Sequence, residues 1–156
     1  MIFVTTGTQE PFDRFLEIID SLAPEIDEEL VVQACSSAYT PHNYKLRGFI
    51  APDEFNGIME RARLIVAHAG MGSILTAMQM RKPIIIFPRK ASLGEHRNDH
   101  QMATAHRMAE LRYVHVAYDA DELRRLLSDN GLQPLHSVGE FASESLVSSI
   151  ADFIAK

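Results

Sequence analysis

The fold class follows from the stretch Leu64-Ile65-Val66-Ala67-His68-Ala69-Gly70-Met71-Gly72-Ser73-Ile74-Leu75. Its first four residues are apolar, which predicts a buried strand. Two glycines come soon after them, and the chain then enters a segment with helical spacing. A buried strand that turns through glycine directly into a helix is typical of a parallel sheet covered by helices.

The rest of the chain repeats this alternation. Stretches with apolar residues at three- and four-residue steps separate most of the short apolar runs, which predicts helices between strands. No internal repeat, low-complexity tract or linker interrupts the pattern. The sequence therefore predicts a single compact α/β domain over residues 1–156. Its other strands are expected at residues 2–5, 30–34, 46–50, 83–87 and 114–117.

Several helix ends can be predicted from capping residues. Asp53 and Asp119 precede apolar periodic segments, and an aspartate there accepts hydrogen bonds from the free N–H groups of the first turn. A third helix is expected to open at Gly72–Ser73, and a fourth at Asn98 or Asp99. A last helix is expected from Ser143 or Glu144 through Phe153.

Composition limits the class of protein. The 156 residues are 46% apolar and carry a net charge of −6, so the chain is of globular composition and general affinity for nucleic acid is disfavoured. The lone cysteine, Cys35, cannot form an internal disulfide, which fits a reducing compartment. Residues 1–7 lack a basic segment of the signal-peptide type, and no run approaches about 18 apolar residues. We therefore expect a cytoplasmic protein.

The loops that follow the strands are the expected place for a ligand, because open α/β sheets bind at the carboxyl ends of their strands. Residues 5–9 (TTGTQ) follow the first strand, and residues 68–73 (HAGMGS) lead into a helix. Glycines before a helix expose N–H groups at the positive end of the helix dipole, which suits a diphosphate. Two other interpretations remain: the glycines only make the turn tight, and His68 is a hydrogen-bonded core histidine.

Residues 89–101 form the longest polar stretch and suit a hydroxyl-rich ligand or, alternatively, a solvated helix start with its own ion pairs. His96 and His100 have the spacing of zinc ligands on a helix, but the HExxH form is absent and a metal site is disfavoured. No GxSxG nucleophile motif occurs. The GxGxxG dinucleotide fingerprint is also missing, because Ser73 and Ile74 follow Gly72.

Taken together in order and spacing, these motifs resemble the donor-binding half of GT-B glycosyltransferases. The similarity is to the glycosyltransferase family 28 C-terminal domain, and more closely to stand-alone Alg13-like subunits and bacterial exopolysaccharide counterparts. It extends from Met1 to about Leu127 and rests on four segments. They are Phe3–Thr8 with Phe12–Asp13, Ile65–Leu75, Lys82–Ile84 and Asn98–Gln101. The resemblance implies a Rossmann-like domain with a mainly parallel sheet of about six strands flanked by helices.

The resemblance also implies roles for individual residues. Arg89 and Arg97 are candidate contacts to phosphate or to a partner, and uracil is expected near residues 49–52. In many relatives a glutamate grips the ribose three residues after the serine, but Thr76 stands there in this sequence. The sugar is expected to contact Asp99, His100 and Gln101. The donor diphosphate is expected to contact Gly7, Thr8, His68, Gly70, Gly72 and Ser73.

A GT-B enzyme closes two such halves over its reaction, and this chain resembles one half. The resemblance therefore implies a subunit that binds a UDP-sugar and becomes active with a membrane-associated partner. That partner would supply the catalytic base, the lipid-linked acceptor, and recruitment to the inner face of the membrane. No cofactor and no metal are expected. A transferred hexose-type sugar and a role in polysaccharide or glycan biosynthesis are implied.

A different class of function is also considered. The chain could be a non-enzymatic subunit that binds a nucleotide-sugar, or only the partner, and stabilises another transferase. Both the missing half and Thr76 favour this alternative. An isolated half that exposes its partner-facing surface could also pair with a second copy of itself.

Overall fold

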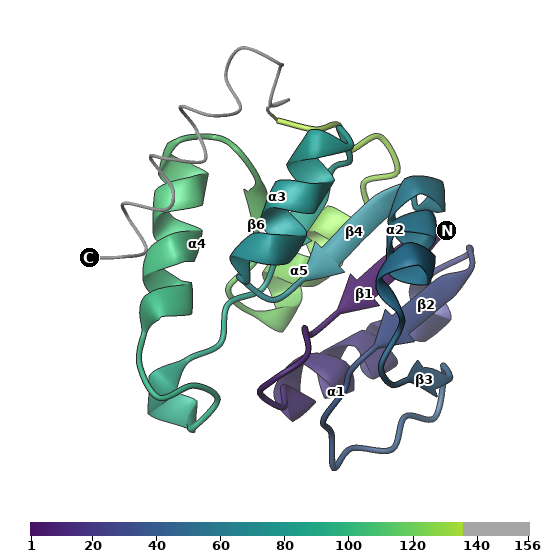
Figure 1. The fold of residues 1–156 in the computed structure, drawn as a ribbon, viewed down its shortest axis with the longest axis horizontal. Helices are drawn as coiled ribbons and strands as arrows, with labels where there is room; N and C mark the ends of the chain where they lie inside the picture. The colour runs from purple at the N-terminus through teal and green to yellow at the C-terminus, as the bar shows by residue number, and fades with distance from the viewer. Residues whose placement is uncertain (136–156) are drawn as a thin grey trace.

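The structure is a computed structural model and describes residues 1–135. Six strands form one parallel sheet in the order β3-β2-β1-β4-β5-β6 (Figure 1). This confirms the predicted α/β class and the sheet of about six strands. The strands are β1 (Ile2–Thr5), β2 (Leu30–Gln33), β3 (Leu46–Arg47), β4 (Leu64–Ala67), β5 (Ile84–Ile86) and β6 (His115–Val116).

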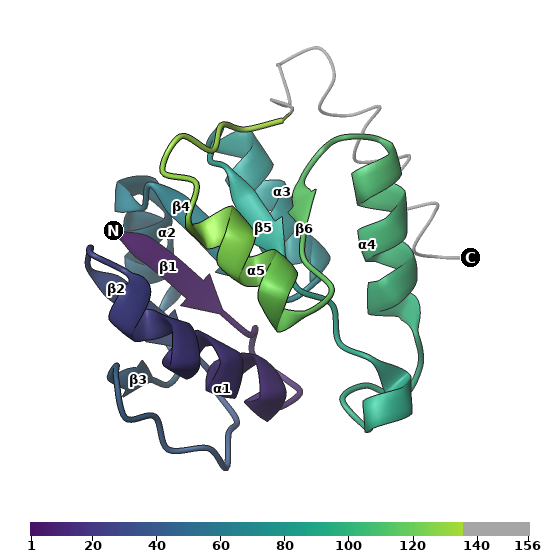
Figure 2. The same ribbon diagram turned by 180° about the vertical axis from the view of Figure 1, so that it is seen from behind.

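Helices cover both faces of the sheet. On one face lie α2 (Pro52–Arg61), α3 (Met71–Gln79) and α4 (His100–Glu110) (Figure 1). On the other lie α1 (Asp13–Leu22) and α5 (Ala120–Leu127) (Figure 2). Two short 3-10 turns, η1 (Ala23–Glu25) and η2 (Ala91–Leu93), complete the described elements.

The central strands β1 and β4 are apolar along nearly their whole length, with Thr5 at the end of β1 as the exception, because both of their faces are buried. Phe3 of β1 and Ile65 of β4 pack in the core under α2 and α3, whereas Val4 and Val66 pack in the core under α1. Successive side chains of a strand point to opposite faces, so a strand covered on both sides needs an unbroken apolar run. This is the physical reason why the short apolar runs predicted the strands correctly.

The order of the strands creates a switch point between β1 and β4. The chain leaves β1 toward β2 on one side and leaves β4 toward β5 on the other. The loops after the two strands therefore separate, and a crevice opens at the carboxyl edge of the sheet. The two glycine loops predicted from sequence, residues 5–9 and 68–73, both lie at this edge.

Some predicted boundaries are corrected by the structure. Asp53 is not the cap of α2: Pro52 takes the first helical position and Ala51 the cap, because the residue before a proline is driven into extended backbone. The third helix begins at Met71, after Gly70 in extended conformation, rather than at Gly72–Ser73. The third strand ends at Arg47 instead of Ile50.

Other boundary predictions are confirmed. Asp119 caps α5, where its carboxylate accepts a hydrogen bond from the N–H of Glu122 at 2.8 Å. Asp99 takes the cap position of α4. The last predicted helix, through Phe153, lies outside the described residues. In residues 1–135, no helix is long and apolar enough to cross a membrane.

Candidate functional site

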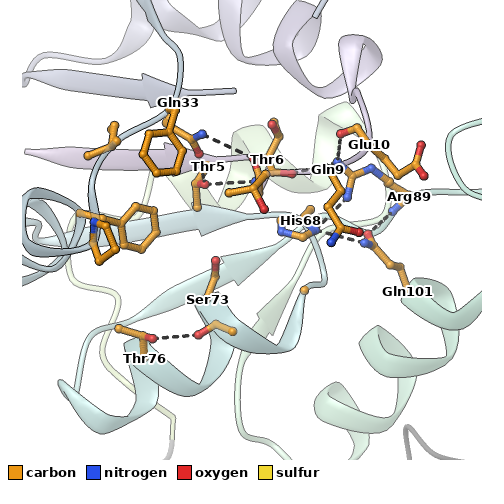
Figure 3. Close-up of a pocket in the computed structure, with 18 of the residues that line it drawn as sticks. Thr5, Thr6, Gln9, Glu10, Gln33, His68, Ser73, Thr76, Arg89 and Gln101 are labelled. Carbon is orange, nitrogen blue, oxygen red and sulfur yellow. Dashed lines mark hydrogen bonds between the residues drawn. The ribbon is translucent and has the colours of Figure 1, made fainter. Parts of the chain in front are cut away.

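A cavity of about 480 Å³ opens at the switch point (Figure 3). The loop after β1, residues 5–10, forms one side, and the turn after β4 with the first part of α3 forms another. Residues between β3 and α2 and along the start of α2 close a third side. Arg89, His96 and Gln101 complete the lining from the segment that follows β5.

His68 stands at the centre of this cavity, between two glycines. A Cβ atom added to Gly70 would lie 2.2 Å from Cε1 of His68, and one added to Gly7 would lie 2.7 Å from Nε2. Gly7 also has a φ of +82°, which favours glycine. The two loops can approach the imidazole this closely only because neither glycine carries a side chain.

The His68 ring is held by two side chains from the segment after β5, as Figure 3 shows. Its Nδ1 lies 2.8 Å from Nη1 of Arg89 and 3.1 Å from Nε2 of Gln101. Burial, together with the positive charges of Arg89 and then His96, lowers the pKa of His68 to about 3. The imidazole is therefore neutral at physiological pH.

Arg89 faces inward and is 2% exposed. Its Nη2 donates to the carbonyl oxygens of Thr6 at 2.8 Å and Glu10 at 2.6 Å, and its guanidinium lies 4.9 Å from the centre of the Phe12 ring. The guanidinium thus joins the loop after β1 to His68. The sequence suggested Arg89 as a contact to phosphate or to a partner, but most of its donors are used inside the protein.

Gln101 is anchored by the backbone. Its Oε1 accepts hydrogen bonds from the N–H groups of Ala69 at 3.3 Å and Arg89 at 3.1 Å. The side chain is buried, and its Nε2 faces His68. The first turn of α4 therefore braces the turn after β4.

The start of α3 faces the cavity with unpaired N–H groups. Gly72 and Ser73 of its first turn line the wall, so the positive end of this nine-residue helix points at the space beside His68. Thr76, one turn further on, also lines the wall, and its hydroxyl donates to the carbonyl of Gly72 at 2.8 Å. Thr76 therefore offers a ligand an oxygen acceptor.

The wall near α2 is mostly apolar, with Asn56 as its polar residue, and contrasts with the polar centre. Phe49, Ile50, Pro52 and Phe55 line it, and Phe49 is 74% exposed. Phe55 packs edge-on against Phe3 of the core, with ring centres 5.3 Å apart. The cavity thus has one apolar end and one end rich in donors.

Three of the predicted site residues lie away from the cavity. Arg97, Asp99 and His100 are exposed and do not line it. Asp99 accepts a hydrogen bond from the N–H of Ala91 at 3.0 Å, which closes the loop around η2. The other predicted residues, Gly7, Thr8, His68, Gly70, Gly72, Ser73, Thr76, Arg89 and Gln101, all line the cavity.

The segment before α4 is held in place by ion pairing. Arg14 of α1 contacts both carboxylate oxygens of Glu95, at 2.7 and 2.9 Å, and its guanidinium lies over the Phe87 ring. Glu95 also accepts a hydrogen bond from the N–H of Lys90 at 3.0 Å. Glu95 belongs to the stretch for which the sequence left open a solvated helix start. In the structure its carboxylate instead forms an ion pair with Arg14 of α1, which is distant in sequence.

The sequence did not identify some of the lining residues as ligand contacts. Gln33 accepts a hydrogen bond from Thr5 at 2.5 Å and lines the cavity from the end of β2. The only indication in the sequence is that Gln33 is a polar residue at the end of an apolar run. Gln9, Glu10 and His96 also line the cavity. Within residues 1–135, no group of three His, Cys, Asp or Glu side chains is arranged to hold a metal ion.

Both unpaired buried side-chain atoms of the described part of the chain lie at this site. They are Oγ1 of Thr6 and Nε of Arg89. Buried polar groups normally find partners, and an unpaired one is costly. Their concentration around one cavity is typical of a functional site rather than of a packed core.

A parallel α/β domain with glycine loops, a helix N-terminus and a neutral histidine at its switch point belongs to the class of Rossmann-like domains. The chain belongs to the glycosyltransferase family 28 C-terminal domain, whose sequence profile matches residues 1–152.

Relatives of known name are consistent with this family. The chain is 28% identical over 137 residues to the "UDP-N-acetylglucosamine transferase subunit ALG13" of Yarrowia lipolytica. The matched region covers 79% of this chain and 67% of the relative. A protein of the same name from Eremothecium gossypii is 27% identical over 130 residues, covering 82% of this chain and 62% of the relative. A third, from Candida albicans, is matched over only 28% of its length.

Solved structures share the fold. The solution structure of ALG13 matches 99% of this chain and 96% of its own with a TM-score of 0.65 and 19% sequence identity. The Streptomyces glycosyltransferase SsfS6, complexed with thymidine diphosphate, matches 99% of this chain but 36% of its own, with a TM-score of 0.54 and 17% identity. The fold of this chain therefore corresponds to one part of a larger glycosyltransferase.

Proposed function

We propose that the chain is the donor-binding subunit of a two-component glycosyltransferase and binds a UDP-sugar in the cavity at the switch point. The observation that carries this proposal is the meeting of His68, two glycine loops and the start of α3 at one point. All of these groups favour an anion with several acceptor oxygens. The family match and the names of the relatives supply the nucleotide-sugar.

The orientation of the ligand follows from the two ends of the cavity. The diphosphate lies beside Gly7, His68 and the first turn of α3, and the uracil lies toward the apolar wall that includes Phe49. Thr76, between them, accepts a hydrogen bond from a ribose hydroxyl. The transferred sugar lies toward the segment after β5, where the second amide proton of Gln101 is free to bind a hydroxyl.

The chemistry is a displacement at the anomeric carbon. A hydroxyl oxygen of the acceptor forms the new bond to this carbon while the bond to the diphosphate oxygen breaks, and UDP leaves with the electron pair. His68 and the N–H groups at the start of α3 stabilise the charge that develops on the leaving phosphate. The acceptor proton passes to a base on the partner subunit. No metal or other cofactor takes part.

The partner is proposed to be a membrane-associated subunit that binds a lipid-linked acceptor. Two observations support it: known glycosyltransferase structures are matched over little more than a third of their length, and some relatives are named as transferase subunits. We further propose that the protein works in the cytoplasm, at the inner face of the membrane, and that the sugar is of the hexose type.

Calorimetric titration with UDP tests the assigned phosphate site. His68→Ala should weaken binding roughly 10- to 100-fold, because a hydrogen bond to a charged group is lost. His106→Ala is the matched control, since His106 stacks on Tyr118 outside the cavity. Equal affinity of the wild type and His68→Ala would refute the role given to His68.

Reconstitution tests the reaction itself. The chain is mixed with a membrane subunit encoded beside it, a lipid diphosphate sugar as acceptor, and UDP-N-acetylglucosamine or UDP-glucose. UDP release well above that of the partner alone is expected. If UDP binds to the chain but release does not rise, the chain is a non-enzymatic nucleotide-sugar-binding subunit.

A further inference from the structure

The two side chains that contact Nδ1 of His68 determine where its ring proton lies. The guanidinium of Arg89 has only donors to offer, so the 2.8 Å contact from its Nη1 makes Nδ1 an acceptor. The contacts of Gln101 independently indicate that Nδ1 is an acceptor. Its Oε1 is occupied by the N–H groups of Ala69 and Arg89, which turns Nε2 and its protons toward Nδ1.

A neutral imidazole that accepts at Nδ1 carries its proton on Nε2. Nε2 lies 2.7 Å from the position that a Cβ on Gly7 would occupy and 2.6 Å from the corresponding position on Gly70, where only Cε1 of the same ring is nearer. These two glycines leave open the space into which the N–H of His68 points. The ring therefore presents a donor to the cavity.

We propose that Arg89 and Gln101 are positioning residues that hold His68 as the neutral Nε2–H form, so that the cavity always offers a donor to a phosphate oxygen. This inference rests on the proposed function. It assigns Arg89 a role through His68 instead of a direct phosphate contact, and it adds a second role to Gln101. It also distinguishes the site from one in which a protonated histidine attracts phosphate by charge.

The charged groups around His68 favour a neutral imidazole that takes up no proton near neutral pH. The cation of Arg89 touches the ring, and within residues 1–135 His96 is the other group whose charge acts on it. Gln101 of α4 is uncharged, and Gly72 and Ser73 of α3 bring no charge. Glu10 contributes its backbone carbonyl to Arg89. The exposed carboxylate of Glu10 and the mostly buried carboxylate of Glu95 act on the guanidinium rather than on the ring.

The sharpest test is Gln101→Glu, which keeps the shape of the side chain. One carboxylate oxygen still accepts from the two backbone N–H groups, but the other now faces Nδ1 as an acceptor and draws the ring proton to it. Neutral His68 then turns a lone pair on Nε2 toward phosphate. At acid pH the ring protonates and becomes a donor again.

Calorimetric titration with UDP at pH 8 and pH 5.5 measures this effect as the affinity ratio of variant to wild type, which cancels the ionisation of UDP itself. For Gln101→Glu we expect a loss of roughly 10- to 100-fold at pH 8 that largely disappears at pH 5.5. Gln9→Glu is the matched control, because Gln9 lines the same cavity, whereas Nδ1 of His68 is contacted by Arg89 and Gln101. Its ratio should be the same at both pH values.

A direct readout does not depend on binding. In the wild type, ¹⁵N NMR of the histidine rings should show His68 with an unprotonated Nδ1 and a protonated Nε2 from pH 5.5 to 8. A proton on Nδ1, or formation of the imidazolium in this range, would overturn the inference even if Gln101→Glu does not fold. Equal affinity ratios of Gln101→Glu at the two pH values would overturn it as well. Absence of UDP binding by the wild type would instead refute the proposed function.

Discussion

Protonation of His68 should link the stability of the fold to pH. Its pKa is lowered to about 3 in the folded protein by burial and by the charges of Arg89 and His96, whereas an unfolded histidine titrates near 6.5. Below pH 6.5 the unfolded chain therefore binds a proton that the folded chain does not. The free energy of unfolding falls as the pH falls, and the contribution of His68 is fully present only above pH 6.5.

The magnitude follows from the two pKa values. Between pH 7 and pH 5.5, proton binding to the unfolded state removes about 1.3 kcal/mol for a single histidine that stays neutral when folded. The chain has seven histidines, so the effect must be isolated by difference. His68→Gln removes the titrating group while keeping a polar side chain at this position.

Urea unfolding of both proteins at pH 7 and 5.5 provides the measurement. The wild type should lose about 1.3 kcal/mol more than His68→Gln over this interval. Equal losses in the wild type and His68→Gln would show that His68 is protonated in the folded protein, which would contradict the geometry around Nδ1.

Three further predictions concern stability and can be checked by thermal or urea unfolding. Gly70→Ala places a Cβ 2.2 Å from the ring of His68 and should destabilise the fold by about 1–3 kcal/mol. In Gly72→Ala the new Cβ meets nothing within 4 Å, so this control should be neutral or stabilising by up to about 1 kcal/mol. Equal effects of the two substitutions would contradict the crowding at His68. Phe15→Ala empties a fully buried position among stacked rings and should cost about 3–5 kcal/mol, and a loss below about 1 kcal/mol would be incompatible with this packing. Asp119→Ala removes the cap of α5 and should cost about 1 kcal/mol, while Asp119→Asn, which keeps an acceptor, should lose much less.

The fold was predictable because its signals are local. Strands buried on both faces contain runs of apolar residues, and the runs in β1, β2, β4 and β5 were found for this reason. The cap of α5 at Asp119 was found because the N–H donor that its carboxylate accepts from, that of Glu122, lies only three residues further on. The predicted cap of α2, Asp53, was wrong, since Pro52 imposes extended backbone on Ala51 and Ala51 therefore takes the cap position.

The candidate site was predictable in part. The glycine loops, His68 and Gln101 were found from motifs and all line one cavity. Arg97, Asp99 and His100 neighbour Gln101 in sequence but lie outside that cavity, because the side chains that surround the cap of α4 point in different directions. Gln33 was missed since a single polar residue at the end of a strand has no motif around it.

The sequence by itself determined the parallel α/β class, the glycine turn before α3 and the family resemblance, because each depends on the order of residues along a short stretch. The tertiary structure decided what those residues do together. Arg89 lies 21 residues from His68 and 83 from Thr6, yet its guanidinium contacts both. Only the packing of β1, β4 and β5 side by side brings these groups together, and the position of the proton on His68 follows from that packing.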